Sequence, residues 1–235
     1  MKVKQGIIAP EGKVFLGADY SQCQLRIAAF LAQDEAMMDI FRRGEDIHSA
    51  TADFVFGDHE PDHRYLAKTI NLAILFGVGV AKIMEIAREA NMSREEAEAM
   101  MANLFEHKYT RIEPHIKEVL AAAHMNGFVE TLYGRRRYLP NLEAKQYGVR
   151  MAAEREAFNT TVQGTEADVI KKAMIQCAAI APIVQQVHDE IVFEIDQGQI
   201  EDKAASIKKI MESVNPDLNL VVDIHTGCNL AELKG

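Results

Sequence analysis

Two acidic residues stand at the ends of apolar stretches, where a folded chain can hold a metal ion. Asp19 ends the apolar run at 14–18, and Asp189 lies between two further stretches, 183–187 and 191–195, that are rich in apolar residues. The first run predicts a buried strand, and the other two predict a pair of buried strands meeting at a tight turn. Each acid is therefore expected on a rigid strand end, where carboxylate oxygens can bind a hard cation.

The predicted turn carries three ionisable residues in a row, His188, Asp189 and Glu190. Adjacent carboxylates repel each other, so the pair needs a cation or a protonated partner nearby. Taken alone, such a turn is more often a solvated hairpin tip, and Asp19 fits an N-cap of a following helix equally well.

A second set of chemically useful side chains lies along one helix, predicted for 64–76 and ended by a glycine. Arg64, Lys68, Leu72 and Phe76 recur every four residues and so form one slowly drifting stripe. The stripe suits a phosphate at its cationic end and a sugar or base at its apolar end. The alternative is a solvated charged end followed by a buried apolar end.

Further polar groups are spread along the chain. His48 is expected in the first turn of a helix over 46–56, whose positive end suits a phosphate. Three arginines, 135–137, form the densest basic cluster, with aromatic residues on each side of a glycine turn. Asn159 and Gln163 are uncharged amides at an expected junction between two helices.

The elements that must position these groups are predicted from apolar periodicity and turn residues. Strands are expected at 14–19, 183–187, 191–195 and 218–224, and an extended segment with a turn at 128–140. Helices are expected at 20–31, 34–43, 46–56, 64–76, throughout 78–120, at 147–159, from about 168 to 180, and at 200–214. Within the long helical stretch, a capping box at Ser93 begins a helix that ends near His107, and a further helix ends near 126–127.

Composition limits the class of protein. The chain has 235 residues, enough for one large or two small domains, and a net charge of −9 argues against an overall basic nucleic-acid binder. No run of about 18 apolar residues or signal peptide is found. The three cysteines, far apart, fit neither disulfides nor zinc and suggest a reducing compartment, with a cytoplasmic location expected.

Several motifs, in order, resemble the polymerase motifs of family A DNA polymerases, the bacterial DNA polymerase I type. They are a strand followed by Asp-Tyr-Ser-Gln at 19–22, the pattern Arg-x3-Lys-x3-Leu-x3-Phe-Gly at 64–77, and Val-His-Asp-Glu at 187–190. The segments 131–140 and 163–168 match further parts of the family, and the resemblance runs from about residue 7 to 223.

The resemblance implies an α+β fold, in which an antiparallel palm sheet with flanking helices is interrupted by a helical fingers subdomain. Residues 1–45 and 151–235 would form the palm, and 46–150 the fingers. Because the chain begins only 18 residues before Asp19, no thumb or exonuclease domain is expected in it. Either it is a fragment, or a second polypeptide supplies the thumb and the first part of the palm.

The resemblance further implies template-directed addition of deoxynucleotides to a primer on a DNA template, with two Mg²⁺ ions. Asp19 and Asp189 would be the catalytic metal ligands, assisted by the Tyr20 backbone carbonyl, with Glu190 as a secondary catalytic acid. His188 would lie against the primer end.

The same resemblance assigns the remaining contacts. Residues that would bind the dNTP are Gln24, His48, Arg64, Lys68, Leu72 and Phe76. Residues that would bind the primer–template DNA are Arg135, Arg136, Arg137, Asn159, Gln163 and His188.

Three residues depart from the family pattern. Gln24 stands where glutamate is usual, and Phe76 where tyrosine is usual, so we interpret the two as compensating changes that keep sugar selection through the bulk of Gln24. Leu72 replaces an aromatic residue, which predicts weaker stacking and slower incorporation. Leucine here is similar to some phage polymerases and is a hint of phage origin.

Two other hypotheses compete with a polymerase. One is a non-catalytic nucleic-acid-binding or subunit-interaction module derived from such an enzyme. The other is a metal-dependent phosphohydrolase, which would need more ligands than the sequence offers near the two acids. The joint presence of Asp19, Asp189, Arg64 and Lys68 favours the polymerase, since a simple binding module has no need of two metal-holding acids.

Overall fold

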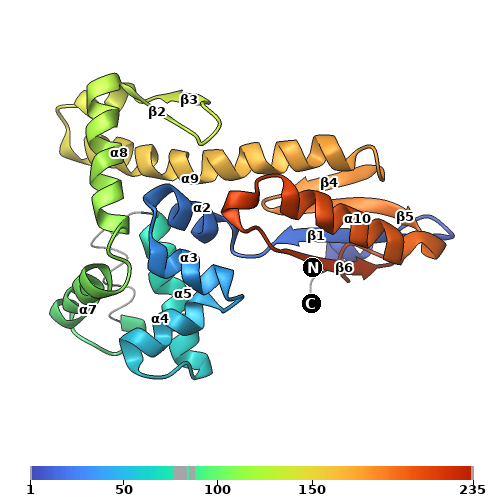
Figure 1. Ribbon diagram of the computed structural model, residues 1–235, viewed down its shortest axis with the longest axis horizontal. Helices are drawn as coiled ribbons and strands as arrows, with labels where there is room; N and C mark the ends of the chain where they lie inside the picture. The colour runs from blue at the N-terminus through green and yellow to red at the C-terminus, as the bar shows by residue number, and fades with distance from the viewer. Residues whose placement is uncertain (1, 77–83, 85–87, 234–235) are drawn as a thin grey trace. The chain divides into compact units, whose positions relative to one another are not determined.

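The protein's structure is a computed structural model that describes residues 2–76, 84 and 88–233. Its contacts divide the chain into two compact units, unit 1 formed by residues 1–23 and 166–235 and unit 2 formed by residues 24–165. Unit 1 contains a four-stranded sheet, whereas unit 2 is mainly helical with a small hairpin (Figure 1). The two units do not test the predicted subdomains, so the assignment of the palm to 1–45 and 151–235 and of the fingers to 46–150 stays a prediction.

The sheet of unit 1 has the strand order β4-β5-β1-β6 and is antiparallel throughout. The strands are β1 (Lys13–Tyr20), β4 (Ile183–Val187), β5 (Glu190–Asp196) and β6 (Val222–Gly227). The predicted α+β class with an antiparallel sheet is thus confirmed. The last strand was expected at 218–224, which is wrong at its start, because Pro216–Leu218 forms a 3-10 turn instead.

Both faces of this sheet are covered by other parts of unit 1. Alternate residues of β1 point to opposite faces. Leu16, Ala18 and Tyr20 are buried on the side of helix α10 (Ile200–Ser213), which packs on β1, β5 and β6. On the other side, Phe15 belongs to a cluster with Val192, Leu230 and Leu233.

The two ends of the described chain meet beside the sheet. Ile8 and Asn229 form an isolated antiparallel bridge, and the backbone N–H of Ala9 donates to the carbonyl of Cys228 at 2.9 Å. The short helix α1 (Lys2–Gln5) precedes this contact. The C-terminal segment therefore serves as a cover for the sheet face that carries Phe15.

Unit 2 is built from helices whose predicted positions are largely confirmed. Its helices are α2 (Cys23–Ala32, its first residue in unit 1), α3 (Glu35–Arg42), α4 (Ile47–Phe56), α5 (Pro61–Phe76), α7 (Arg94–His107) and α8 (Ile112–Asn126). The expected capping box at Ser93 is present, since its side chain accepts from the Glu96 N–H while the Glu96 carboxylate accepts from the Ser93 N–H.

Helix does not run throughout 78–120, because a turn at 108–111 separates α7 from α8, whereas the predicted helix ends near His107 and near 126–127 are confirmed. Residues 77–83 and 85–87 lie outside the described residues. Asp34 explains how the turn is held, because it caps α3 through the Met37 N–H and also accepts from the Arg111 N–H at 3.0 Å.

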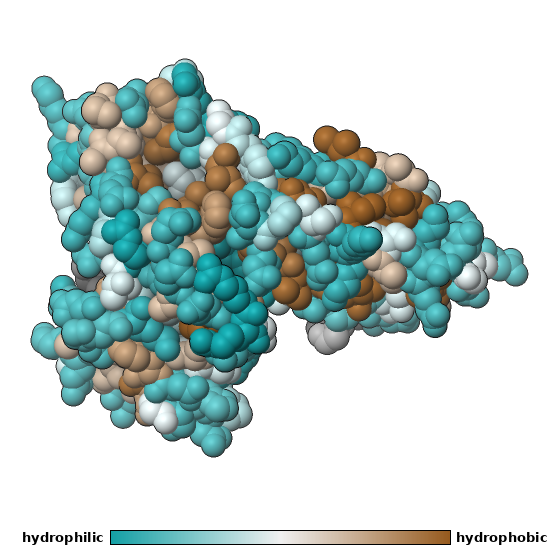
Figure 2. All heavy atoms as spheres, viewed as in Figure 1, coloured by the Kyte–Doolittle hydropathy of each residue, from teal (hydrophilic) through white to brown (hydrophobic). Residues whose placement is uncertain are grey.

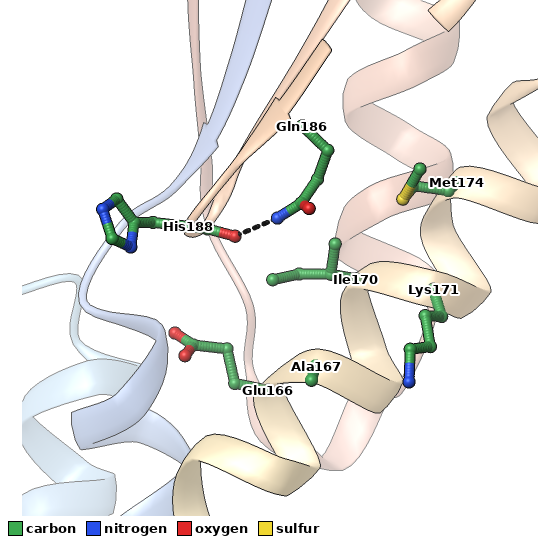
Figure 3. Close-up of a pocket in the computed structure, with 7 residues that line it drawn as sticks. All are labelled: Glu166, Ala167, Ile170, Lys171, Met174, Gln186 and His188. Atoms are coloured by element: carbon green, nitrogen blue, oxygen red, sulfur yellow. Dashed lines mark hydrogen bonds between the residues drawn. The ribbon is translucent and has the colours of Figure 1, made fainter.

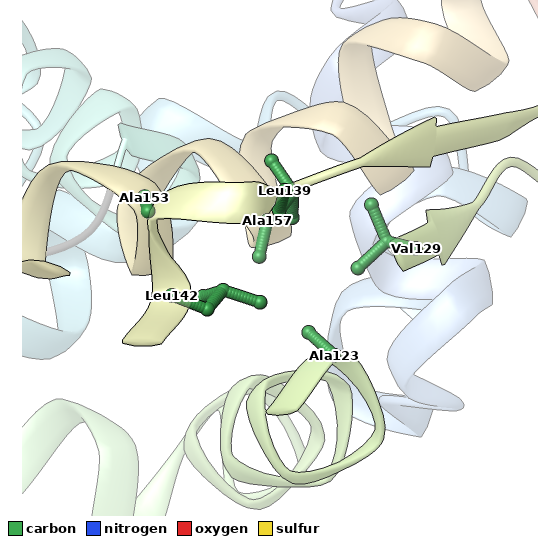
Figure 4. Packing of buried hydrophobic residues seen from close by; sticks show 6 residues of the cluster. All are labelled: Ala123, Val129, Leu139, Leu142, Ala153 and Ala157. Atoms are coloured by element: carbon green, nitrogen blue, oxygen red, sulfur yellow. The ribbon is translucent and has the colours of Figure 1, made fainter. Parts of the chain in front are cut away.

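A small apolar core joins α8 to the hairpin of β2 (Phe128–Glu130) and β3 (Arg136–Tyr138). The 3-10 turn at Pro140–Glu143 and helix α9 (Tyr147–Cys177) also contribute side chains to this core, and Figure 4 shows these side chains pointing toward one another. Its buried members are Ala123, Val129, Leu139, Leu142, Ala153 and Ala157. The hairpin is thus anchored to two helices.

Helix α9 corrects a further expectation, because it runs without interruption from Tyr147 to Cys177. Two helices with a junction near 160–168 were predicted. In the structure the threonine hydroxyls donate to carbonyls of the preceding turn, as Thr160 does to Glu156 and Thr165 to Thr161. This satisfies the hydroxyls inside a continuous helix.

The surface is mixed in polarity. Figure 2 shows hydrophobic atoms reaching the surface over the C-terminal part of α9 and the neighbouring strands of unit 1, among otherwise hydrophilic side chains. Ile175 and Val184 are two exposed apolar residues of these elements. Within the described ranges, none of the helices has the length and apolar character needed to cross a bilayer.

Candidate functional site

The strand pairing of unit 1 brings Asp19 next to the hairpin that carries Asp189. β1 pairs with β5 in a register that places Asp19 opposite Glu190, and the Tyr20 backbone N–H donates to the Asp189 carbonyl at 3.3 Å. Asp19 lies on β1 and Asp189 lies in the turn directly before β5, so the predicted placement of the two acids on one sheet, at neighbouring strands, is confirmed. About 170 residues separate them in the chain, so only the sheet can bring them together.

Tyr20 is fixed on both its backbone and its side chain. The ring is 1% exposed and its hydroxyl donates to the Met211 carbonyl of α10 at 2.9 Å. In an antiparallel ladder the N–H and C=O of one residue point to the same side. Since the N–H of Tyr20 points to Asp189, its carbonyl is expected on the same side of β1, toward the β4–β5 hairpin.

Asp19 has a carboxylate opposite it on each neighbouring strand. Glu190 of β5 and Asp223 of β6 are its direct register partners, so all three side chains lie on one sheet face. Asp223 was not identified from the sequence. Like charges directly opposite each other destabilise a sheet, so this arrangement is unfavourable unless a positive group lies nearby.

Glu190 owes its position to a glycine. A Cβ atom on Gly17 would lie 2.8 Å from Glu190 Oε1 and 3.5 Å from Leu233 Cδ1. The Glu190 carboxylate therefore lies over β1 two residues before Asp19, in space that a larger residue at 17 would fill.

The hairpin tip itself is a two-residue turn, His188-Asp189, because Val187 pairs directly with Glu190. His188 has φ = 55°, the left-handed region that costs free energy for a residue with a Cβ. Gln186 Nε2 donates to the His188 carbonyl at 2.6 Å and braces the turn (Figure 3).

A shallow cavity of about 160 Å³ adjoins this turn within unit 1. Figure 3 shows the Glu166 carboxylate and Gln186 on opposite sides of it, with His188 at the left. The remaining lining residues come from α9 and are Ala167, Ile170, Lys171 and Met174. The cavity is mostly apolar, with polar groups at its edges.

A larger ligand cluster is absent from the part of the chain that the structure describes. There, no group of three or more His, Cys, Asp or Glu side chains is placed to hold a metal ion. The predicted ligand set is smaller than such a cluster, because it consists of two carboxylates and one backbone carbonyl. Mg²⁺ commonly takes its remaining ligands from substrate phosphates and water. The residues therefore fit the predicted metal.

The predicted dNTP-binding residues lie in unit 2. Arg64 and Lys68 are exposed on α5, and Leu72 is half-buried one turn further on. Arg64 Nε donates to Asp46 Oδ2 at 2.8 Å, and that same oxygen caps α4 by accepting from the Ser49 N–H.

Two further residues predicted to bind the dNTP are Phe76 and Gln24. Phe76 is the last residue of α5, and its side chain lies outside the described residues. Gln24 is a half-buried residue of α2.

His48 lies in the first turn of α4, as predicted, but it is 6% exposed and not a surface residue. Burial is the main reason that its pKa falls from 6.5 to about 4, with the nearby cations Arg64 and Lys68 lowering it further and Asp46 raising it. The ring is therefore neutral near pH 7. Asn71 of α5 contacts its Nδ1 at 2.9 Å.

The arginine cluster is engaged within the protein. Arg136 Nε donates to Glu130 at 2.6 Å, and Arg137 forms an ion pair with Glu156 of α9. Arg135 Nη2 donates to the Gly164 carbonyl at 2.8 Å. These contacts lock the hairpin onto α9, and the predicted role of the three arginines in DNA binding stays a prediction.

Asn159 and Gln163 lie one turn apart on α9, where Gln163 is exposed. Asn159 Oδ1 is buried, and no described group donates a hydrogen bond to it. The next residues of α9 contact the segment that follows β2. The Leu132 N–H donates to Thr165 Oγ1 at 2.9 Å, and a Cβ on Gly164 would lie 2.7 Å from Thr131 Cγ2. Glycine at 164 lets the hairpin approach the helix.

Comparison with known proteins identifies the family. A family model described as DNA polymerase family A matches residues 1–232. The chain belongs to this family, as the resemblance predicted, whereas a phage origin finds no support in the comparisons.

Relatives and a solved structure agree with this assignment. The chain is 37% identical to thermostable DNA polymerase I of Thermus filiformis and 37% identical to DNA polymerase I of Pseudomonas aeruginosa, over 99% and 98% of its length. It spans only 29% and 26% of those relatives. The polymerase domain of Pol1 from M. smegmatis, solved with a DNA primer–template and a dNTP, matches with a TM-score of 0.91 at 31% identity, covering 100% of this chain and 43% of that one.

Proposed function

We propose that the chain is the catalytic portion of a template-directed DNA polymerase, which adds deoxynucleotides to the 3′ end of a primer. The observation that carries this proposal is the register of β1 with β5, which places Asp19 beside the hairpin of Asp189. The relatives named DNA polymerase I, and the similar structure bound to primer–template and dNTP, support it.

Asp19 and Asp189 would hold two Mg²⁺ ions together with the Tyr20 carbonyl, since hard oxygen ligands suit this metal. Bound magnesium supplies activation of the primer hydroxyl and neutralisation of charge on the departing pyrophosphate. The chain's own contribution is rigidity: both acids are fixed to one sheet by backbone hydrogen bonds. Glu190, held over Gly17, acts as the secondary acid.

His188 would contact the primer end. Its left-handed backbone and the Gln186 hydrogen bond fix the direction in which the hairpin tip presents its side chain. The adjoining cavity, lined by Ile170 and Met174 and edged by Glu166, gives that end of the primer an apolar surface to lie against.

In unit 2, Arg64 and Lys68 would bind the triphosphate of the incoming nucleotide, with His48 as a third contact. Arginine suits a bidentate grip on phosphate and lysine a point charge. Both charges stabilise the pyrophosphate as it leaves. Arg64 would exchange its hydrogen bond to Asp46 for one to phosphate.

Primer–template contacts would come from the hairpin and α9. Asn159 and Gln163 offer amide groups on one helix face, and the three arginines offer positive charge nearby in the same unit. Base pairing selects the nucleotide, so these residues bind mainly the DNA backbone and its shape.

Sugar selection would rest on Gln24, and stacking on Leu72. Gln24→Ala is expected to raise ribonucleotide incorporation relative to deoxynucleotide incorporation, because the bulk that excludes a 2′-hydroxyl is lost. Leu72→Phe is expected to speed incorporation and improve acceptance of dideoxynucleotides. Unchanged strict exclusion in the first variant, or an unchanged rate in the second, would contradict these roles.

A primer-extension assay with Mg²⁺ tests the proposed function directly. Four reactions, each with one dNTP and a template of known next base, should give extension only with the complementary nucleotide. Binding of the primer–template without any extension would instead indicate a non-catalytic nucleic-acid-binding module.

A further inference from the structure

A chain of buried polar side chains runs behind His48 in unit 2. His48 Nδ1 lies 2.9 Å from Asn71 Nδ2, Asn71 Oδ1 lies 3.0 Å from Thr51 Oγ1, and Thr51 Oγ1 lies 2.7 Å from the Tyr109 hydroxyl. Asn71, Thr51 and Tyr109 are completely buried and His48 is 6% exposed. Buried polar groups arranged in this way must satisfy one another, so their proton positions can be deduced.

The orientation of the Asn71 amide follows from its two other neighbours. The Ile47 carbonyl lies 3.4 Å from Asn71 Nδ2, and a carbonyl can only accept, so the amide NH₂ must face it. On the other side, Asn71 Oδ1 and the Ile47 carbonyl lie 3.0 Å and 2.8 Å from Thr51 Oγ1, and the two acceptors share the single hydroxyl proton of Thr51 in a three-centre hydrogen bond. Tyr109 must then donate to Thr51.

The proton position on His48 follows from this orientation. Because Asn71 presents N–H to Nδ1, that ring nitrogen has to accept and cannot carry a proton. We propose that Asn71 is a positioning residue, which holds His48 as the neutral tautomer with its proton on Nε2. A charged imidazole would place two N–H groups against each other.

The charges around His48 act in the same direction. Arg64 and Lys68 of α5 disfavour a positive ring, and only Asp46, at the start of α4, favours one. Asp46 is already engaged by Arg64 and by the Ser49 N–H. Tyr109 is the other titratable residue among these buried polar side chains, and it stays protonated because burial raises its pKa.

The consequence for catalysis rests on the proposed function. A neutral His48 with its proton on Nε2 is a hydrogen-bond donor of fixed direction beside two permanent cations. It can donate to a triphosphate oxygen without the repulsion that a third positive charge would add. Asn71 thus acts on the nucleotide only through His48.

Nitrogen NMR of the full chain, labelled with ¹⁵N-histidine, tests the tautomer without any nucleotide. His48→Gln identifies the His48 signals by their loss. The expected spectrum has a protonated Nε2 and an unprotonated Nδ1, unchanged between about pH 8 and about pH 5. Exposed His59, whose pKa is raised by Asp53, should titrate in the same range and serves as an internal control. A proton on Nδ1, or a doubly protonated ring at about pH 6, would overturn the proposal.

Asn71→Asp is the matched variant, because it keeps the shape and replaces the donor by an acceptor. The proton is expected to move to Nδ1 and the titration midpoint of His48 to rise by at least about one pH unit. An unchanged tautomer in this variant would overturn the role of Asn71. If Asn71→Asp does not fold, the spectrum of the unaltered chain still decides the tautomer.

A titration with dATP and Mg²⁺ separates this inference from the proposed function. If His48 has the expected tautomer and its Nε2 signal shifts on addition of nucleotide, the positioning by Asn71 and the triphosphate contact of His48 are both supported. If the tautomer is as expected but no histidine signal responds to dATP, the positioning by Asn71 stands and the triphosphate contact fails.

Discussion

The backbone N–H of Tyr20 donates to the carbonyl of Asp189, and this bond joins the end of β1 to the tip of the β4–β5 hairpin. It continues the β1–β5 ladder by one residue beyond the pair of Asp19 and Glu190. Two acids far apart in the chain thus become neighbours through backbone geometry, and side-chain substitutions at either one leave that geometry in place.

Asp19→Asn and Asp189→Asn should each abolish primer extension while the chain stays folded. Loss of a residue that only supports a metal ligand typically costs 10–100-fold, so loss of a ligand should cost more than about 100-fold. Single-turnover extension measures the rate, and circular dichroism checks folding. Asp196→Asn, at the far end of β5, is the control and should extend at the original rate.

Gly164→Ala should destabilise unit 2 by up to about 2 kcal/mol. The new Cβ would lie 2.7 Å from Thr131 Cγ2, and such overpacking costs about 1–3 kcal/mol, against about 1 kcal/mol gained from alanine's helix propensity. Gly148→Ala is the matched control in the same helix, since nothing lies within 4 Å of its Cβ position. Thermal melts compare the two; equal melting temperatures would show that the hairpin moves away freely.

Tyr20→Phe should lower the unfolding free energy of unit 1 by about 1 kcal/mol. The substitution removes the buried hydrogen bond to the Met211 carbonyl, which keeps only a long contact of 3.5 Å from the Val214 N–H. Tyr65→Phe, at a tyrosine that is 62% exposed, should change stability by less than about 0.5 kcal/mol. Urea denaturation measures both, and a neutral Tyr20→Phe would mean that the ring alone holds α10 in place.

The sequence could predict the acids and their strands because apolar runs and a turn mark them locally. It could not predict the alignment of strands, which depends on packing across about 200 residues. Asp223 faces Asp19 only because β6 pairs with β1 in this register, and no local pattern marks it. Gly17 is similar, since its need for space appears only once Glu190 lies over it.

The arginine cluster and the threonine-rich segment show the opposite limit, where distant residues make contacts that the local pattern does not predict. Arg137 looked available for a ligand, yet its partner Glu156 lies on α9. The segment 160–165 looked like a junction, although its hydroxyls bond to the preceding turn of one long helix. The burial of His48 could not be predicted from the sequence around it, because its ring contacts Asn71, which a later helix contributes.

His48 should make the folded chain less stable in acid. Its pKa is about 4 in the folded state and 6.5 in the unfolded chain, so between these values the unfolded state binds the proton more tightly. Stability is therefore unaffected above about pH 6.5 and falls as the pH drops toward 4. The full loss of unfolding free energy well below pH 4 corresponds to about 3 kcal/mol.

The matched measurement compares the pH dependence of urea denaturation for the original chain and for His48→Asn. Carboxylates and His115, whose pKa burial also lowers, titrate in both proteins and cancel in the comparison. The stability difference between the two proteins should be constant above about pH 6.5 and shrink or reverse toward pH 4. Parallel pH profiles over the whole range would mean that His48 titrates in the folded state as it does in the unfolded chain, and that burial beside Asn71 does not hold it neutral.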